Sequence, residues 1–273
     1  MAPAEVGFAI DCAAAEGWNP GDSDAACFYA ADPQGFLVAL VDGRPVGCVS
    51  AVRYPDGFAF LGLFIVVPEL RGQGIGTALW RAAIDRLAGC TIGLDGVVAM
   101  QDAYATSGFV LAHRNIRYAG TIADRSLSAG TARLMDASDL PSVLALDARA
   151  FGSSRPAFLR SWLAQSRGRS YVHPGPDGVR GFTVARPCRQ GVKIGPLFAD
   201  DAEVAENLFA VVARNQPPGT MLVLDVPEPN AAAGDLARRH AMEPVFETAR
   251  MYRGPDPRLP LDLVFGITTF ELG

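Results

Sequence analysis

Apolar residues in the first quarter of the chain fall into three short runs that predict a β-meander. The first run covers 36–41 and is followed by Asp42-Gly43, a dipeptide that favours a tight hairpin turn. The second run covers 45–54. The third, 58–67, is apolar along its whole length, as expected for a central strand covered on both faces. A proline follows it directly and ends the strand, because proline cannot donate a hydrogen bond to a neighbour.

A glycine-rich turn at 71–76 leads from the third strand into a predicted helix. Apolar residues recur there at helical spacing and define the expected buried face, namely Ile75, Leu79, Ala82, Ala83 and Leu87. The pattern then predicts a strand at 91–99, a short helix at 99–107 and a strand at 109–118. The first unit is therefore an α/β structure with a mostly antiparallel sheet.

A second unit with a similar order of elements follows a small, polar stretch at 119–130. We therefore predict a domain at 1–120, a linker at 121–130 and a second domain at 131–273. The helices expected in the second domain lie at 136–151, 156–166, 201–214 and 230–241, and its strands at 181–186, 192–199, 220–226, 246–252 and 262–271.

The composition supports two folded domains and argues against a disordered or nucleic-acid-binding protein. In 273 residues, 49% are hydrophobic and 19% charged, which argues against extended disorder. The net charge is −5 with no basic face, so nucleic acid is not an expected partner. The acidic excess lies in the first 120 residues, which either favours a cationic substrate or only solvates the surface.

Several sites and locations are not expected from this sequence. The five cysteines form no CxxC pair and the three histidines lie far apart, so free thiols are favoured and no metal is expected. No apolar run approaches the ~18 residues of a membrane span, and the first residues lack the basic region of a signal peptide. We expect a cytoplasmic monomer or homodimer that contacts no membrane.

The glycine-rich turn has the chemistry of a phosphate site. Gly72, Gly74 and Gly76 remove the Cβ atoms that would block close approach, and Thr77 adds a hydroxyl donor. Successive backbone N–H groups and the positive end of the helix dipole favour an anion there. The alternative is a purely structural turn.

Three phosphate-binding patterns can be compared with residues 71–76. A Walker P-loop requires a lysine that is absent here. A dinucleotide fingerprint requires GxGxxG after the first strand of a parallel unit, whereas this GxGxG follows a meander. The third pattern, [QR]xxGx[GA] between a strand and a helix, is met in full.

This third pattern resembles the acetyl-CoA motif of the GNAT superfamily of N-acetyltransferases. FIVVPELRGQGIGTALW carries that likeness, and QDAYATSGFV is similar to the second signature of the superfamily, a tyrosine five residues before the Phe of a Gly-Phe pair. Together the motifs cover about residues 36–118. The whole chain resembles tandem GNAT proteins with a degenerate second copy, which implies two domains, each a mixed, mostly antiparallel sheet flanked by helices.

The resemblance implies a reaction and a set of cofactor contacts. Acetyl-CoA would be the co-substrate, without a metal, and a small-molecule primary amine would attack it directly in a ternary complex. The strand before the loop would splay from its neighbour, with a main-chain N–H near Val66 polarising the thioester carbonyl. The residues assigned to cofactor binding are Ile65, Val66, Val67, Arg71, Gly72, Gln73, Gly74, Ile75, Gly76 and Thr77.

The same resemblance suggests acid–base groups. Tyr104 would protonate the departing thiolate, although it could instead be a packing residue. Glu69 and Asp95 are candidates for the base, with a solvated loop residue and a turn-forming Asp-Gly as the alternatives. Val97 stands where many family members have an asparagine that contacts the cofactor.

Trp18, Asn19 and Asp22 precede the meander and lie where family members shape the acceptor pocket, unless they form only a capped turn.

In the second domain, the stretch that replaces the glycine loop is acidic (198–208), so we expect no cofactor there. The functional alternatives are a non-catalytic acyl-CoA sensor and transfer of a longer acyl or aminoacyl group.

Overall fold

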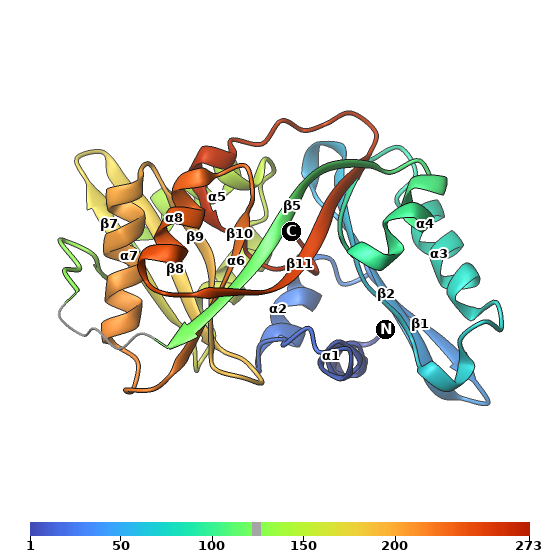
Figure 1. The fold of residues 1–273 in the computed structure, drawn as a ribbon. Helices are drawn as coiled ribbons and strands as arrows, with labels where there is room; N and C mark the ends of the chain where they lie inside the picture. Colours follow the sequence, from blue (N-terminus) through green and yellow to red (C-terminus); the bar gives the residue numbers. More distant parts are fainter. Residues whose placement is uncertain (122–126) are drawn as a thin grey trace.

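The computed structural model describes residues 1–121 and 127–273. We call these the first half and the second half. The described strands form one continuous sheet in the order β1-β2-β3-β4-β11-β5-β10-β9-β8-β7-β6, with β12 beside β9 (Figure 1). Helices flank this mixed, mostly antiparallel sheet, which confirms the predicted fold class.

The first half begins with two helices and continues with the predicted meander. Its strands are β1 (Phe36–Val41), β2 (Arg44–Arg53), β3 (Phe58–Val66), β4 (Thr91–Val97) and β5 (Val110–Thr121). Its helices are α1 (Val6–Ala15), α2 (Asp24–Ala31), α3 (Ile75–Arg86) and α4 (Gln101–Thr106). The meander and the elements after it are confirmed, but α1 and α2 were not predicted. Leu79 and Ala83 of α3, and Leu87 directly after it, are buried as expected, whereas Ile75 is half-buried and Ala82 is exposed.

The second half repeats the order of the first from its helices onward. Its helices are α5 (Leu140–Phe151), α6 (Pro156–Leu163), α7 (Ala202–Arg214) and α8 (Ala231–Arg239). Its strands are β6 (Arg133–Leu134), β7 (Arg169–Gly175), β8 (Gly178–Pro187), β9 (Val192–Ala199), β10 (Met221–Pro227), β11 (Glu243–Arg253) and β12 (Val264–Gly266). Strand β7 was not predicted. The strand expected at 262–271 is wrong beyond Gly266, where the chain is irregular and buried.

Two long strands cross between the halves. Strand β11 of the second half lies between β4 and β5, with Met251 opposite Leu94. Strand β5 of the first half pairs with β10, with Ile116 opposite Val226. Figure 1 shows this exchange as the green and red strands that run side by side through the middle of the molecule. The domain boundaries stay a prediction, and residues 122–126 of the predicted linker lie outside the described residues.

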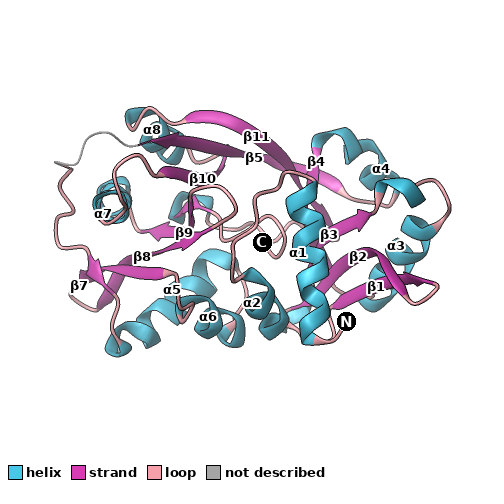
Figure 2. Cartoon of the chain, turned by 90° about the horizontal axis from the view of Figure 1, so that it is seen from below, coloured by secondary structure: helices cyan, strands magenta, loops and turns pink. Residues whose placement is uncertain are grey.

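The core between the halves is shared. One apolar cluster contains Phe28 and Phe60 of the first half together with Trp162 and Phe198 of the second, all buried. The rings of Phe28 and Trp162 stack with centroids 6.1 Å apart. Helix α2, which carries Phe28, lies beside α6, which carries Trp162 (Figure 2). Because burial of such rings stabilises a fold by a few kcal/mol each, about 1.5–3 for a Phe, this interface holds the halves together.

Candidate active site

Strands β3 and β4 are paired over only part of their length. Their parallel register runs from Phe58 opposite Thr91 to Leu61 opposite Leu94, although β3 continues to Val66. Leu63, two residues past the last pair, has a φ of 48°, which is rare outside glycine. The register between β2 and β3 shifts at the same place. The two strands therefore diverge, as the family resemblance implied, and leave backbone groups of β3 facing an open wedge.

The glycine turn lies at the wide end of this wedge. Gly72 and Gly74 have φ angles of 77° and 84°, a left-handed conformation that disfavours any residue with a side chain. A Cβ atom added at either position would meet nothing within 4 Å, so the backbone of the turn faces open space. Gly74 is the residue before α3, whose first backbone N–H groups have no side-chain cap. The turn is thus an accessible donor array of the kind that binds phosphates.

Arg71, the first residue of the turn, contacts both the end of β3 and Glu16. Its Nε donates to the Val66 oxygen at 2.8 Å, and its guanidinium also pairs with Glu16, the residue after α1. The arginine side chain is half exposed. These two contacts fix the start of the turn against the end of β3 and against Glu16.

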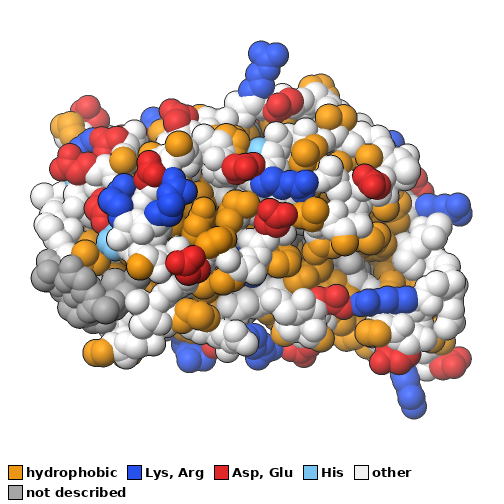
Figure 3. Space-filling view, viewed as in Figure 1, with side chains coloured by type: hydrophobic (Ala, Val, Ile, Leu, Met, Phe, Trp, Pro, Cys, Tyr) orange, Lys and Arg blue, Asp and Glu red, His pale blue; other side chains and the backbone are white. Residues whose placement is uncertain are grey.

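A cavity of about 350 Å³ occupies the wedge. It is lined mainly by apolar side chains, and Figure 3 shows such side chains around a hollow on the side of the first half. Of the predicted cofactor residues, Ile65, Val66, Arg71, Gly72 and Gly76 line it. This volume falls in the range of small-molecule sites.

Tyr104 lines the same cavity from helix α4. Its ring stacks on Trp80 of α3, with centroids 5.6 Å apart. Burial raises the pKa of Tyr104, so the phenol keeps its proton at neutral pH. No described residue accepts a hydrogen bond from its hydroxyl group, which leaves that proton available to a ligand.

Asp95 also lines the cavity, but both of its carboxylate oxygens are engaged. Arg250 of β11 donates to them through Nε and Nη2, at 2.7 Å each, and Asn115 donates to Oδ1 at 2.7 Å. Burial raises the pKa of Asp95, and Arg250 and Asn115 oppose that rise. Burial of the Arg250 guanidinium lowers the pKa of Arg250, but Asp95 opposes this effect and holds that pKa above its ordinary value. The pair ties β4 to β11, and the predicted role of Asp95 as a base stays a prediction.

The other predicted side chains are divided between the cavity and the surface. Trp18 lines the cavity. Asn19 does not, because its amide donates to the Gln190 oxygen at 3.0 Å and links the halves. Asp22 is exposed and pairs with Arg167. Glu69 is exposed in the turn after β3 and is not among the cavity residues. The predicted roles of Asn19, Asp22 and Glu69 stay predictions.

Sequence reasoning assigned part of the acceptor pocket to the second domain but missed the residues that form this wall of the cavity. Four residues of the second half line the cavity: Phe246 and Thr248 of β11, and Phe270 and Glu271 of the segment after β12. No local motif marks them. They reach the site only because β11 is inserted beside β4 and because the segment after β12 passes through the middle of the molecule.

The equivalent wedge of the second half is already filled. Strands β9 and β10 are parallel, like β3 and β4, and α7 follows β9 as α3 follows β3. Strand β12 pairs with β9, and the Ile267 N–H donates to the Asp225 oxygen of β10 at 2.9 Å. The N-terminus of α7 is capped by its own Asp201, which accepts from the Val204 N–H at 2.9 Å. Chain atoms thus occupy the wedge between β9 and β10, and the absence of a cofactor from the second half stays a prediction.

Two family models match this chain, one on each side of the predicted linker. Residues 8–109 match the acetyltransferase (GNAT) family, and residues 143–266 match an acetyltransferase (GNAT) domain. A holothin acyltransferase from Pseudoalteromonas sp. (strain SANK 73390) is 30% identical over 96% of this chain and 89% of its own length. The chain belongs to the GNAT family of acetyltransferases. It is a tandem-domain member and an acyltransferase of that family.

Solved structures agree with this family at the level of the fold. A proposed acetyltransferase from Pyrococcus horikoshii has a TM-score of 0.84 and 23% identity, covering 100% of this GNAT chain and 94% of its own. A tandem GNAT protein from the clavulanic acid biosynthesis pathway has a TM-score of 0.64 and 18% identity, covering 94% and 98%. Across residues 1–121 and 127–273, no helix is long and apolar enough to cross a bilayer. The same residues contain no group of three His, Cys, Asp or Glu side chains that could hold a metal.

Proposed function

We propose that this GNAT protein transfers an acetyl group from acetyl-CoA to the amino group of a small molecule, by direct attack in a ternary complex. The observation that carries the proposal is the wedge between β3 and β4, which joins an open glycine turn at one end to Tyr104 within one cavity. Acetyl-CoA would supply the activated acyl group.

The residues of the chain would then bind and orient the reactants. The turn at 72–77 would hold the pyrophosphate through backbone N–H groups. The free backbone groups of β3 beyond Leu61 would pair with the pantetheine arm, and an N–H near Val66 would hydrogen-bond the thioester oxygen. Tyr104 would donate its proton to the departing thiolate. The apolar wall would exclude water from the thioester.

A longer acyl donor is the second candidate. The relative from Pseudoalteromonas is called a holothin acyltransferase, a name that is not restricted to acetyl. In this chain the cavity is lined by Leu61, Leu63 and Met100, which suit an alkyl chain.

A direct assay tests both candidates. The protein is incubated with acetyl-, propionyl-, butyryl- or hexanoyl-CoA and a panel of alkyl and aromatic primary amines, and products are identified by mass spectrometry. We expect an amide product with release of CoA. Tight binding of acyl-CoA without transfer to any amine would contradict the proposal and would favour a sensor.

A further inference from the structure

The segment 264–273 joins the filled wedge of the second half to the cavity of the first. Every residue in it is buried. After β12 it passes against β3, where a Cβ atom added to Gly62 would lie 2.2 Å from the Glu271 main-chain oxygen. The Tyr54 hydroxyl donates to the Leu272 oxygen at 2.9 Å and fixes the segment there. Glu271 therefore lies beside the irregularity at Leu63, where the two strands begin to diverge.

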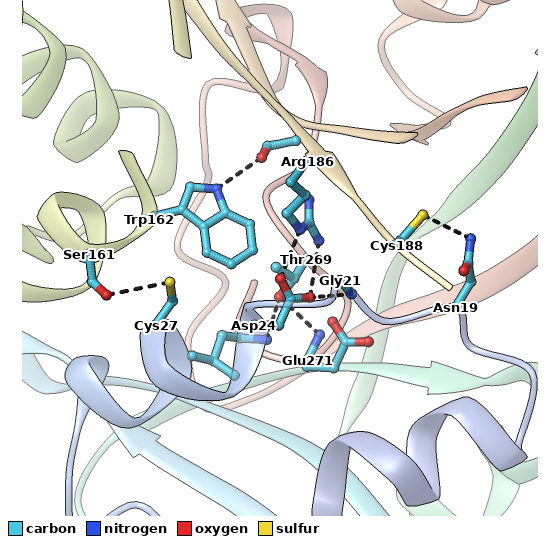
Figure 4. Close-up of polar contacts among 12 residues, drawn as sticks. Asn19, Gly21, Asp24, Cys27, Ser161, Trp162, Arg186, Cys188, Thr269 and Glu271 are labelled. Carbon is cyan, nitrogen blue, oxygen red and sulfur yellow. Dashed lines mark hydrogen bonds and ion pairs between the residues drawn. The ribbon is translucent and has the colours of Figure 1, made fainter. Parts of the chain in front are cut away.

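The Glu271 side chain faces the cavity without a partner. It lines the cavity and is 3% exposed, and its Oε1 has no hydrogen-bond partner among the described residues. In Figure 4 the carboxylate carries no dashed line, whereas the nearby Thr269 hydroxyl accepts from the Glu271 N–H. Thr248 Oγ1, also at the cavity, is a second buried atom without a partner. A buried polar atom without a partner costs about 1–3 kcal/mol, so two at one cavity call for a ligand that pairs with them.

The other acidic side chains at the cavity are committed elsewhere. Its lining contains Glu16, Asp95 and Glu271. Glu16 pairs with Arg71, and Asp95 is held by Arg250 and Asn115. Among these three lining residues, only the Glu271 carboxylate has neither an ion pair nor a hydrogen bond to another described residue.

Three buried cations, Lys193, Arg117 and Arg186, act on Glu271, but the structure shows no ion pair between any of them and its carboxylate. Arg117 of β5 is paired with Asp225 at 2.6 Å, and Arg186 of β8 with Asp24 of α2 at 3.0 Å. Lys193 of β9 is buried, and its pKa is lowered to about 8, chiefly by burial.

Burial raises the pKa of Glu271. Lys193, Arg117 and Arg186 act in the opposite direction, and Asp24 adds to the rise. A carboxylate with a raised pKa is a stronger base than an exposed one, and it gains most from a cationic ligand.

We propose that Glu271, which the second half delivers to the active site of the first, binds the acceptor's amino group and takes its proton. The inference rests on the proposed function and adds the residue that selects and activates the acceptor. Thr248 Oγ1 would accept a second hydrogen bond from the same nitrogen. Trp18, Phe246 and Phe270 would form an apolar wall around the rest of the molecule, so a primary ammonium on an aromatic or alkyl body is the expected substrate class.

The acceptor nitrogen loses one proton before it attacks the thioester and one afterwards. An ammonium group gives its first proton to Glu271, which later releases it to solvent. The neutral nitrogen then forms the C–N bond while the C–S bond breaks. Tyr104 protonates the thiolate, and the second proton of the nitrogen restores the phenol.

The test compares Glu271→Gln with wild type, using acetyl-CoA and the amine that the wild type acylates fastest. We expect kcat/KM for the amine to fall by about 10²–10⁴-fold, while the Kd for CoA, measured by calorimetry, stays within about twofold. In wild type, we expect kcat/KM to fall as the pH is lowered, because Glu271 becomes protonated. This fall on the acidic side of the pH profile should be absent from Glu271→Gln. Glu271→Asp keeps a carboxylate, so it should recover part of the rate and part of this pH dependence.

A stability measurement separates this role from a structural one. Because the fold raises the pKa of Glu271, the ionised side chain destabilises the protein at pH 7.5, and Glu271→Gln should melt at or above the wild-type temperature. Glu247→Gln makes the same chemical change on an exposed residue of β11 and should alter neither rate nor Tm.

The outcomes decide between the two proposals. The inference would be wrong, while the proposed function would stand, if Glu271→Gln kept the wild-type kcat/KM. The same holds if the variant kept the wild-type pH dependence and had a lower Tm. A wild-type protein that binds acyl-CoA but acylates no amine would overturn the proposed function and the inference with it.

Discussion

The buried pair between Asp95 and Arg250 makes the sharpest prediction about stability. The Asp95→Asn variant keeps the shape of the side chain and removes its charge. In the native protein the Asp95 side chain is 0% exposed and the Arg250 side chain 5% exposed. Two hydrogen bonds of 2.7 Å join them, so the substitution leaves a buried guanidinium without its counter-ion.

Breaking such a pair on one side costs about 3–5 kcal/mol. In a protein of this size, this corresponds to a fall in Tm of roughly 10 °C. We would measure Tm by calorimetry and the free energy of unfolding in urea, together with the rate of acyl transfer. Asp11→Asn is the matched control, because Asp11 pairs with Arg189 while 72% exposed, and loss of a surface pair is too small to measure.

A double variant separates the pair from other effects. Asp95→Leu with Arg250→Met removes both charges, so we expect it to recover most of the stability lost in the single variant. If Asp95→Asn melts at the wild-type temperature but has lost acyl transfer, then Asp95 is a base and the structural reasoning is wrong.

Three further predictions concern the cofactor. Gly74→Ala should destabilise the left-handed turn and weaken CoA binding about tenfold or more. The control is Gly43→Ala, at an equally left-handed turn residue with no neighbour within 4 Å, which should lose similar stability without affecting binding. Equal CoA affinity in both variants would show that the turn is not part of the site. Tyr104→Phe should lower kcat by about 10²–10⁴-fold with an unchanged Kd for CoA, and an unaltered kcat would assign protonation of the thiolate to water. Calorimetry should give one CoA per chain, because residues 264–267 fill the second wedge, and a stoichiometry of two would refute that explanation.

Local sequence patterns predicted the parts of the candidate site that are local in the chain. The glycine turn and Tyr104 lie within motifs of a few residues, since a phosphate cradle needs only a strand, a turn and the start of a helix. The meander was equally clear, because Asp42-Gly43 joins two strands that pair with each other.

The parts that were missed depend on long-range pairing. Arg250 is 155 residues from Asp95, and only the insertion of β11 beside β4 brings them together. Thr248 reaches the cavity by the same insertion, and Glu271 by the path of the last segment. The strand expected at 262–271 ends at Gly266, and the residues after it are buried in the centre of the molecule without forming a strand. Helices α1 and α2 were missed because small and apolar residues cover most of their surface and leave no clear polar face.

A crystal structure of the protein with CoA would test the central claim most directly. We expect one CoA per chain, with its pyrophosphate on the backbone of residues 72–77, its pantetheine arm between β3 and β4, and its sulfur beside the Tyr104 hydroxyl. A CoA molecule bound between β9 and β10, or one whose sulfur lies away from Tyr104 and Glu271, would contradict it.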